Sequence, residues 1–300
     1  MKNRREFLKI STVGALGAMA LGPMACASSV ASKPVPGVGL QLYTIRDAIA
    51  ADLLGSLKKV SELGFKFVEL ADYNDGKFYG KSPKEFKKII TDLGMEIKSS
   101  HTSVEAEGIT TESAKKMADA HAEMDVEYCV QPWIEEVDRN VETYKRMIAD
   151  WNKVGEIMKN VGIQFGYHNH NFEFLPTDGM VPYYDIFLKE MDADLITMEL
   201  DLYWATKAGQ DPVEMFKKYP GRFQLLHFKD AGQKAEPYYD VIKDDITSVG
   251  AGHIDFKRIY DARDIAGMKY LFVEDDNQGN GKPFEGIGTS IKNIQSKIFV

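Results

Sequence analysis

The alternation of short apolar runs with amphipathic segments constrains the fold of this 300-residue chain more than any other feature. From residue 38 onward, each run is followed by a polar turn and then by apolar residues at three- and four-residue spacing, which is typical of helix. Strands that alternate with helices form parallel sheets. The predicted strands are Val38–Tyr43, Phe67–Leu70, Ile97–His101, Tyr128–Gln131, Ile163–His168, Ile196–Asp201, Phe223–Lys229 and Tyr270–Glu274.

The helical segments between these runs have recognisable ends. Three of them stop at a glycine, at Gly64, Gly94 and Gly162, and glycine is a common helix stop. Eight strand–helix units in the remaining chain correspond to a closed (β/α)8 barrel, whose usual size is about 250 residues. A doubly wound open sheet is the alternative, but no Gly-x-Gly-x-x-Gly follows the first strand. We predict one α/β domain, a TIM barrel over residues 38–300.

The first 27 residues predict a twin-arginine signal peptide. Arg4-Arg5 is followed by Phe-Leu-Lys, by a short apolar run and by the small residues Ala25-Cys26-Ala27. This order is that of an export signal, and the apolar run is short for a membrane span. Cleavage near Ala27 and lipid modification of Cys26 both remain open. Residues 28–37, with two prolines, read as a linker, and we expect a periplasmic or otherwise exported protein.

Charge and cysteine content exclude several classes of function. Residues 1–27 carry four basic and one acidic side chain, so their removal changes the formal net charge from −8 to about −11. Such a balance repels nucleic acid. Cys129 is then the single cysteine of the barrel, so no internal disulfide can form. Any metal site must be built mainly from histidines and carboxylates.

Polar residues gather at the ends of the predicted strands, where barrel enzymes carry their chemistry. Two histidines and two carboxylates end the last four strands, and we predict that they bind one divalent ion: His168, Asp201, His227 and Glu274. Mixed imidazole and carboxylate ligands suit Mn, Co, Fe, Zn or Ni. His170 shares a strand face with His168 and can be a second ligand, a substrate contact or an orienting partner. Glu199 lies deeper on the face of Asp201, where it can pair with a cation.

Five segments together resemble the sugar phosphate isomerase/epimerase family of xylose isomerase-like TIM barrels. They are Gly39–Asp47, Tyr167–His170, Leu200–Trp204, Leu226–Asp230 and Gly250–Phe256. The resemblance covers residues 38–300 and implies one divalent metal held by Glu, Asp, His and Glu. His168 departs from this pattern at the first position. The departure puts a symmetric two-glutamate mechanism in doubt and leaves Glu274 as the better base, with His170, Glu173 or Lys229 as its counterpart.

The function expected from these residues is proton abstraction next to a carbonyl on a sugar. Glu274 would take the proton and Lys229 would stabilise the oxyanion. Tyr43 and Trp204 offer flat surfaces for a sugar ring, although a tryptophan is as often simply packed. The other predicted substrate contacts are Glu69, His101, Glu173 and His253.

The substrate and the outcome stay open at this stage. Export and the absence of a basic cluster favour an unphosphorylated sugar, keto-sugar or 3-keto-glycoside. Isomerisation, epimerisation and β-elimination of such a substrate share the same first step, removal of a proton next to the carbonyl. An exported carbohydrate-binding barrel without turnover is the alternative from another class. No nucleic acid partner and no membrane span are expected, and homo-oligomers are left open.

Overall fold

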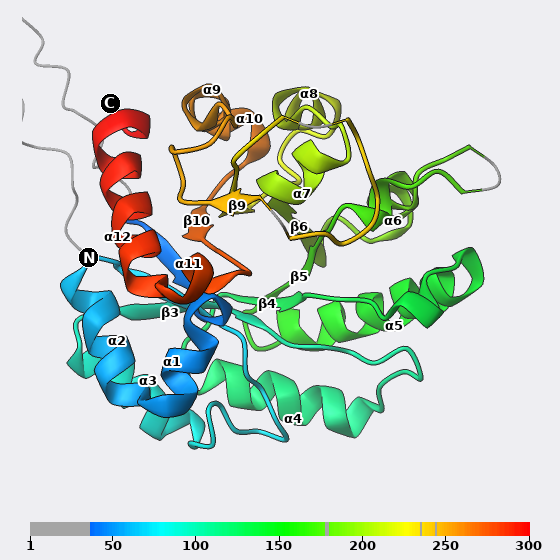
Figure 1. The fold of residues 1–300 in the computed structure, drawn as a ribbon. Helices are drawn as coiled ribbons and strands as arrows, with labels where there is room; N and C mark the ends of the chain where they lie inside the picture. The colour runs from blue at the N-terminus through cyan, green and yellow to red at the C-terminus, as the bar shows by residue number, and fades with distance from the viewer. Residues whose placement is uncertain (1–36, 178–179, 235, 244) are drawn as a thin grey trace, which may run out of the picture. The chain divides into compact units, whose positions relative to one another are not determined.

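A closed parallel barrel forms the centre of the structure, a computed structural model that describes residues 37–177, 180–234, 236–243 and 245–300 (Figure 1). Its strands hydrogen-bond in the order β1, β10, β7, β6, β5, β4, β3, β2, and every pair is parallel. They are β1 (Gly39–Gln41), β2 (Phe67–Leu70), β3 (Glu96–His101), β4 (Tyr128–Gln131), β5 (Gln164–His168), β6 (Ile196–Asp201), β7 (Leu225–Phe228) and β10 (Tyr270–Val273). The predicted single-domain (β/α)8 barrel is confirmed.

Helices follow the strands and flank the barrel, as Figure 1 shows. They are α1 (Arg46–Ala51), α2 (Leu53–Glu62), α3 (Pro83–Asp92), α4 (Thr111–Ala122), α5 (Val141–Lys159), α6 (Tyr183–Glu190), α7 (Leu202–Lys207), α8 (Pro212–Lys218), α9 (Phe256–Asp261), α10 (Arg263–Ala266), α11 (Gln278–Gly281) and α12 (Pro283–Asn293). Local sequence accounts for their ends. In α3 the Ser82 side chain accepts from the backbone N–H of Glu85, whose own side chain accepts from the backbone N–H of Ser82.

The predicted first strand, Val38–Tyr43, is longer than the observed β1. The strand stops at Gln41, and a 3₁₀ turn over Leu42–Ile45 follows, capped by the Gln41 side chain, which accepts from the backbone N–H of Tyr43 at 3.0 Å. The cap re-directs the backbone, so Tyr43 leaves the barrel wall and lies at the cavity described below. The other strand boundaries differ from prediction by two residues or fewer.

An apolar layer fills one end of the barrel interior. It consists of the buried side chains of Phe67, Tyr128, Val130, Leu225 and Phe272. Gly39 makes room for it, because a Cβ there would lie 2.4 Å from the ring of Phe67 and 2.5 Å from that of Phe272. Each strand residue two positions further along faces the same interior. On β2 and β7 these residues are polar, Glu69 and His227.

Asp230 organises the loops after β7. Its carboxylate accepts hydrogen bonds from the backbone N–H groups of Ala231, Gly250, Gly252 and Ile254. Gly252 is needed there, since a Cβ would lie 2.1 Å from the carbonyl oxygen of Ala231. The segment Gly250–Phe256 is therefore explained by loop structure.

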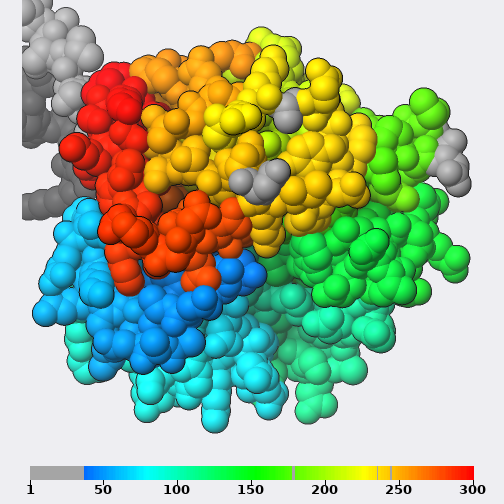
Figure 2. Space-filling view, in the orientation of Figure 1, coloured from blue at the N-terminus to red at the C-terminus, as the bar shows by residue number. Residues whose placement is uncertain are grey.

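A two-stranded antiparallel sheet, β8 (Asp230–Ala231) with β9 (Ile246–Thr247), closes the same region. The connection between its strands lies beside the residues that follow β10, where the Asn277 side chain donates to the carbonyl of Lys243. Figure 2 shows these yellow and orange-red segments meeting on the surface. Among the described residues, no helix is long and apolar enough to cross a membrane. The predicted signal peptide, Cys26 and all but the last residue of the predicted linker lie outside the described residues.

Candidate active site and metal centre

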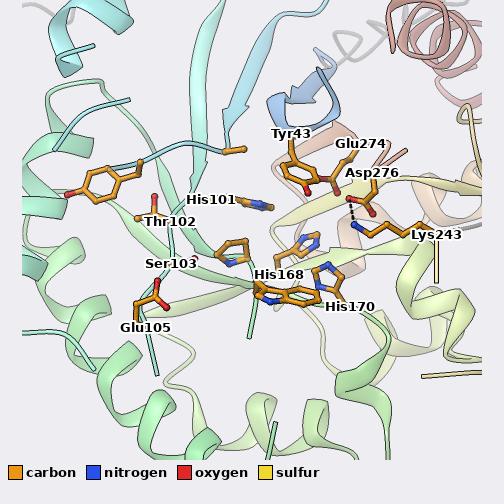
Figure 3. Close-up of a pocket in the computed structure, with 14 residues that line it drawn as sticks. Tyr43, His101, Thr102, Ser103, Glu105, His168, His170, Lys243, Glu274 and Asp276 are labelled. Carbon is orange, nitrogen blue, oxygen red and sulfur yellow. Dashed lines mark ion pairs between the residues drawn. The ribbon is translucent and has the colours of Figure 1, made fainter. Parts of the chain in front are cut away.

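A cavity of about 530 Å³ opens at the carboxyl ends of the barrel strands (Figure 3). It is lined by Tyr43, Ala71, Tyr73, His101, Thr102, Ser103, Glu105, Pro132, Trp133, His168, His170, Lys243, Glu274 and Asp276. These residues come from the ends of the barrel strands and the loops after them, with the exception of β6. The volume falls within the range of about 300–1,000 Å³ that is usual for small-molecule sites. Barrel enzymes carry their active sites at this end.

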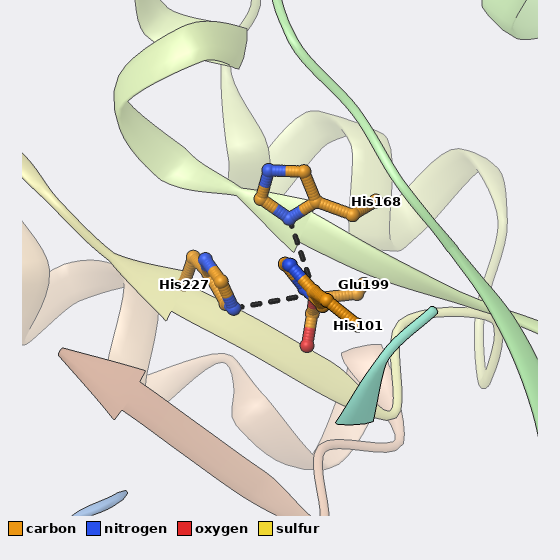
Figure 4. Close-up of side chains that lie close together, drawn as sticks. All are labelled: His101, His168, Glu199 and His227. Atoms are coloured by element: carbon orange, nitrogen blue, oxygen red, sulfur yellow. Dashed lines mark hydrogen bonds and ion pairs between the residues drawn. The ribbon is translucent and has the colours of Figure 1, made fainter. Parts of the chain in front are cut away.

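A polar layer follows the apolar layer in the barrel interior, and one of its members, His101, lines the cavity. The polar layer consists of Glu69, His101, Glu199 and His227, all less than a tenth exposed. The Glu199 carboxylate contacts all three imidazoles around it, those of His101, His168 and His227, at 2.7 to 3.2 Å (Figure 4). Glu69 contacts Nε2 of His227 at 2.6 Å and accepts from the Gln41 side chain at 2.8 Å. Buried carboxylates paired in this way hold imidazole rings in fixed orientations.

These contacts decide which imidazole nitrogens face the other candidate metal ligands. Glu199 engages Nδ1 of His168, which leaves Nε2 of that ring turned toward Asp201. Glu69 engages Nε2 of His227, which leaves Nδ1 turned toward Asp201 and Glu274. Both nitrogens lie 3.9 Å from Oδ2 of Asp201. That separation is too long for a hydrogen bond, whereas ligand atoms about 2.0–2.2 Å from one ion lie roughly 3–4 Å apart.

The four predicted ligands therefore come together. His168, Asp201, His227 and Glu274 each offer one ligand atom within 4.8 Å of the others, and all four are buried. A second group with the same property, His101, His168, Glu199 and His227, overlaps it. In the second group Glu199 contacts all three imidazoles, while in the first Glu274 contacts one imidazole, that of His227, and Oδ2 of Asp201 hydrogen-bonds to neither. The donor set of the first group fits a divalent metal better, and its pattern of an imidazole backed by a carboxylate is common around metals.

Lys229 introduces a positive charge into the same group. Its ammonium is fully buried and lies 2.9 Å from Oδ2 of Asp201, 2.7 Å from Oε2 of Glu274 and 3.0 Å from Oδ2 of Asp276. A buried ammonium requires such partners because an unpaired buried charge is very costly. Burial alone would lower the pKa of Lys229, but Asp201, Asp276 and Glu274 hold the pKa well above its usual value.

The electrostatics divide the site into charged and neutral groups. Burial would raise the pKa of Glu274, but Lys229 and His227 hold it well below its usual range. Burial raises the pKa of Asp201 to about 6, against the opposing effect of Lys229. Burial, with the neighbouring His227, lowers the pKa of His168 to about 3, and burial likewise holds the pKa of His170 well below its usual value. Two neutral imidazoles and an ionised Glu274 therefore face the cavity at neutral pH.

The other predicted site residues differ in whether they line the cavity. Tyr43, His101 and His170 line the cavity. Trp204 is fully buried behind His170, with ring centroids 5.3 Å apart, so it supports the site and offers no open face to a sugar. His253 lies in a separate cavity with Lys207 and Arg258, and its Nδ1 contacts the carbonyl of Ala231 at 2.9 Å. The loop organised by Asp230 therefore fixes the position of His253, away from the barrel cavity.

Glu173 is also withdrawn from the cavity. Its two carboxylate oxygens accept from the Tyr167 hydroxyl at 2.7 Å and from the backbone N–H of His170 at 2.9 Å. Burial raises the pKa of Glu173 to about 7. The residue holds the backbone that presents His170, and the sequence signal for this role is its position three residues after that histidine.

Sequence reasoning missed the side of the cavity formed by loops after β2 to β4. Tyr73 and Trp133 are half-buried aromatic residues there, with Thr102, Ser103 and Glu105 between them. Trp133 is held by the edge-on ring of His170 at 4.7 Å and by the Arg139 guanidinium at 4.6 Å. The position of Trp133 just after a strand was the signal that could have found it. Lys243 and Asp276 were missed as well because they lie in loops.

Comparisons with known proteins agree with this architecture. Residues 57–296 match the family model described as xylose isomerase-like TIM barrel. A crystal structure of a sugar phosphate isomerase/epimerase from Parabacteroides distasonis is 31% identical, with a TM-score of 0.75, over 92% of this chain and 98% of that one.

Curated relatives of the chain include inosose dehydratases. The one from Lacticaseibacillus casei is 28% identical over 153 residues, 47% of this chain and 50% of the relative. The one from Clostridium perfringens is 30% identical over 145 residues, 45% of this chain and 48% of the relative. The alignments thus span about half the length of the curated relatives.

Proposed function

Because the chain belongs to the xylose isomerase-like TIM barrel family, we propose that it is a metal-dependent enzyme that removes a proton next to a carbonyl of an unphosphorylated keto-sugar or keto-cyclitol. The observation that carries the proposal is the position of Glu274. This carboxylate lines the cavity, belongs to the candidate metal group and contacts Lys229. The proton acceptor therefore lies on the cavity wall, with the Lys229 ammonium 2.7 Å away and the other candidate metal ligands close to it.

The residues of the chain have separate tasks in this reaction. The ionised carboxylate of Glu274 takes the proton, a step worth roughly 10²–10⁴ in rate. The ammonium of Lys229, 2.7 Å from that carboxylate, compensates the negative charge that develops on the substrate. The neutral His170 contacts the substrate on the neighbouring wall. A divalent metal held by His168, Asp201, His227 and Glu274 would polarise the carbonyl as a Lewis acid.

β-Elimination is the outcome that we favour over epimerisation. After proton removal, the C–O bond on the next carbon breaks, the oxygen leaves with the electron pair and takes up a proton to depart as water or an alcohol, and the ring gains a C=C double bond. Two-carboxylate epimerisation needs a second carboxylate held across the substrate. The buried carboxylates that line the cavity, Glu274 and Asp276, both follow β10, and the third, Glu105 after β3, is exposed to solvent. The similarity to inosose dehydratases supports the same choice. Epimerisation by Glu274 and the neutral His170 is the second candidate, supported by the similarity to the isomerase/epimerase.

The substrate is proposed to be unphosphorylated and neutral. Among the described residues, Lys243 is the single lysine or arginine that lines the cavity, and its ammonium lies 3.9 Å from Asp276. A phosphate group would need more positive charge than this. Hydroxyl-bearing rings suit the half-buried aromatic side chains of Tyr73 and Trp133.

Proton exchange in D₂O tests the proposal. Keto-inositols, keto-sugars and 3-keto-glycosides are incubated with metal-loaded protein, metal-free protein and Glu274→Gln, and NMR follows both exchange at the α-carbon and the products. We expect metal-dependent exchange that falls at least about 100-fold in the variant. A vinylic product signal identifies elimination, and an inverted stereocentre identifies epimerisation. Binding without exchange by the metal-loaded protein would support a carbohydrate-binding barrel instead.

Export remains part of the proposal. The paired arginines at residues 4 and 5 are the feature that supports it. Cell fractionation of the protein and of a variant with both arginines changed to lysine tests this point. The expected result is loss of the exported form in the variant, and equal distribution of the two proteins would contradict it.

A further inference from the structure

Lys229 shares its carboxylate partners with the candidate metal group. Its ammonium contacts Asp201 and Glu274, which both belong to that group, and it also contacts Asp276, which does not. The lysine and the metal therefore draw on the same two negative groups. No other lysine or arginine of the described chain makes an ion pair with Asp201 or Glu274.

Divalent binding places this ammonium in an unfavourable position. A doubly charged ion held by Asp201 and Glu274 would lie within a few ångströms of the Lys229 ammonium, and like charges so close together repel strongly. Retreat into the apolar layer is too costly for a charge. The third partner, Asp276, can keep the Lys229 ammonium paired when the metal takes Asp201 and Glu274. It lines the cavity, whereas Lys229 itself does not.

We propose that Lys229 and the divalent metal compete for Asp201 and Glu274, and that Asp276 is a positioning residue that takes up the Lys229 ammonium when the metal binds. The inference rests on the metal dependence proposed above. It implies that the metal-free site is kept together by its own lysine. It also implies that metal loading moves an ammonium toward the cavity wall, where it can meet a substrate oxygen.

Metal affinity measured by calorimetry provides the test, with Mn²⁺ and Co²⁺ as titrants of the metal-free protein and Co²⁺ absorption as a second readout. Lys229→Met removes the competitor, and we expect the metal to bind at least about tenfold more tightly. Asp276→Asn removes the carboxylate that would pair with the displaced Lys229 ammonium, and we expect the metal to bind about tenfold more weakly. Lys243→Met is the matched control, because its ammonium lies 3.9 Å from Asp276 without contacting Asp201 or Glu274. It should change affinity less than threefold.

The double variant separates this mechanism from simple loss of charge. In the Lys229→Met background no ammonium has to be displaced onto Asp276. Asp276→Asn should therefore weaken metal binding less than threefold there. A tenfold loss in both backgrounds would mean that Asp276 acts through its charge alone, and would overturn the positioning role. Unchanged or weaker binding in folded Lys229→Met would overturn the competition.

Two further outcomes are decisive. If Lys229→Met does not fold by circular dichroism, Lys229→Gln takes its place in the single- and double-variant comparisons, with the same expected results and the same results that overturn the inference. If the wild-type protein binds metal with the affinity of Lys229→Met, the inference fails while the proposed function survives. If no variant and no wild-type protein binds metal, both fail.

Discussion

The apolar layer and the polar layer of the barrel interior lie only two residues apart on the two strands that contribute to both. The pairs are Phe67 and Glu69 on β2, and Leu225 and His227 on β7. The layers touch, with the rings of His227 and Phe272 6.1 Å apart. Because strand residues two apart share a face, identical backbone geometry supports opposite chemistries. The comparison teaches that the apolar layer stabilises the barrel while the polar layer is kept for function.

The energetic terms differ accordingly. Burying an aromatic ring in the apolar layer is favourable by itself. Burying Glu69 and Glu199 is unfavourable, and the three surrounding imidazoles only compensate this cost. Oε1 of both carboxylates still has no hydrogen-bond partner. A barrel selected for stability alone would fill this level with apolar side chains.

The apolar layer should respond most strongly to truncation. Phe272→Ala removes a fully buried ring, and we expect a loss of about 3–5 kcal/mol in the free energy of unfolding, measured by chemical denaturation. Phe272→Leu, which keeps most of the volume, should lose clearly less. Metal affinity should survive in the folded fraction of either variant. A loss below about 1 kcal/mol for the alanine variant would contradict the supporting role of this layer.

The polar layer should respond through metal binding. At a metal concentration about 100 times the Kd, a bound ion stabilises the folded protein by about 2.7 kcal/mol, and His227→Ala should abolish this gain in unfolding experiments with and without metal. His121→Ala is the matched control. His121 is a fully buried imidazole bonded to Thr102 and to the carbonyl of Met117, outside both metal groups. Full metal stabilisation of His227→Ala would remove His227 from the site.

Glu173 extends the comparison to a buried carboxyl without an imidazole partner. Burial raises its folded-state pKa to about 7 from an ordinary value of 4.5. Its contribution to stability is therefore fully present below about pH 4.5 and is lost as the pH rises through about 7, by at most about 3 kcal/mol. Glu173→Gln should lose less stability than wild type between pH 5 and pH 8.5 in denaturant titrations. Parallel pH profiles for the two proteins would refute this assignment.

Substitution of His253 should have the smallest effect on kcat/KM, because this residue belongs to neither layer and lies in another cavity. We expect His253→Ala to change kcat/KM less than about twofold. His170→Ala, which alters the cavity wall, should lower it at least about tenfold. Steady-state kinetics on the substrate identified by proton exchange measures both. A large loss in His253→Ala alone would move the site toward the Asp230 loop.

Much of the fold and part of the site could be predicted because the signals are local. The metal group followed from the rule that barrel strands end at one rim, which brings residues far apart in sequence together. Tyr73, Trp133 and Lys243 escaped prediction since they lie in loops, whose paths no periodicity describes. Trp204 was predicted as a sugar-stacking surface or as packing, and the helix that follows β6 buries it completely.

The sequence by itself determined the eight strand–helix units, the end of the barrel that carries the chemistry and the ligand types available there. Backbone propensity and side-chain periodicity act over a few residues, so they can be read along the chain. Only the tertiary structure decided which imidazole nitrogen each carboxylate engages, that Glu173 supports the backbone of His170, and that Lys229 shares partners with the metal group. These features depend on distances of a few ångströms between side chains from different strands, and electrostatic interactions change steeply over such distances.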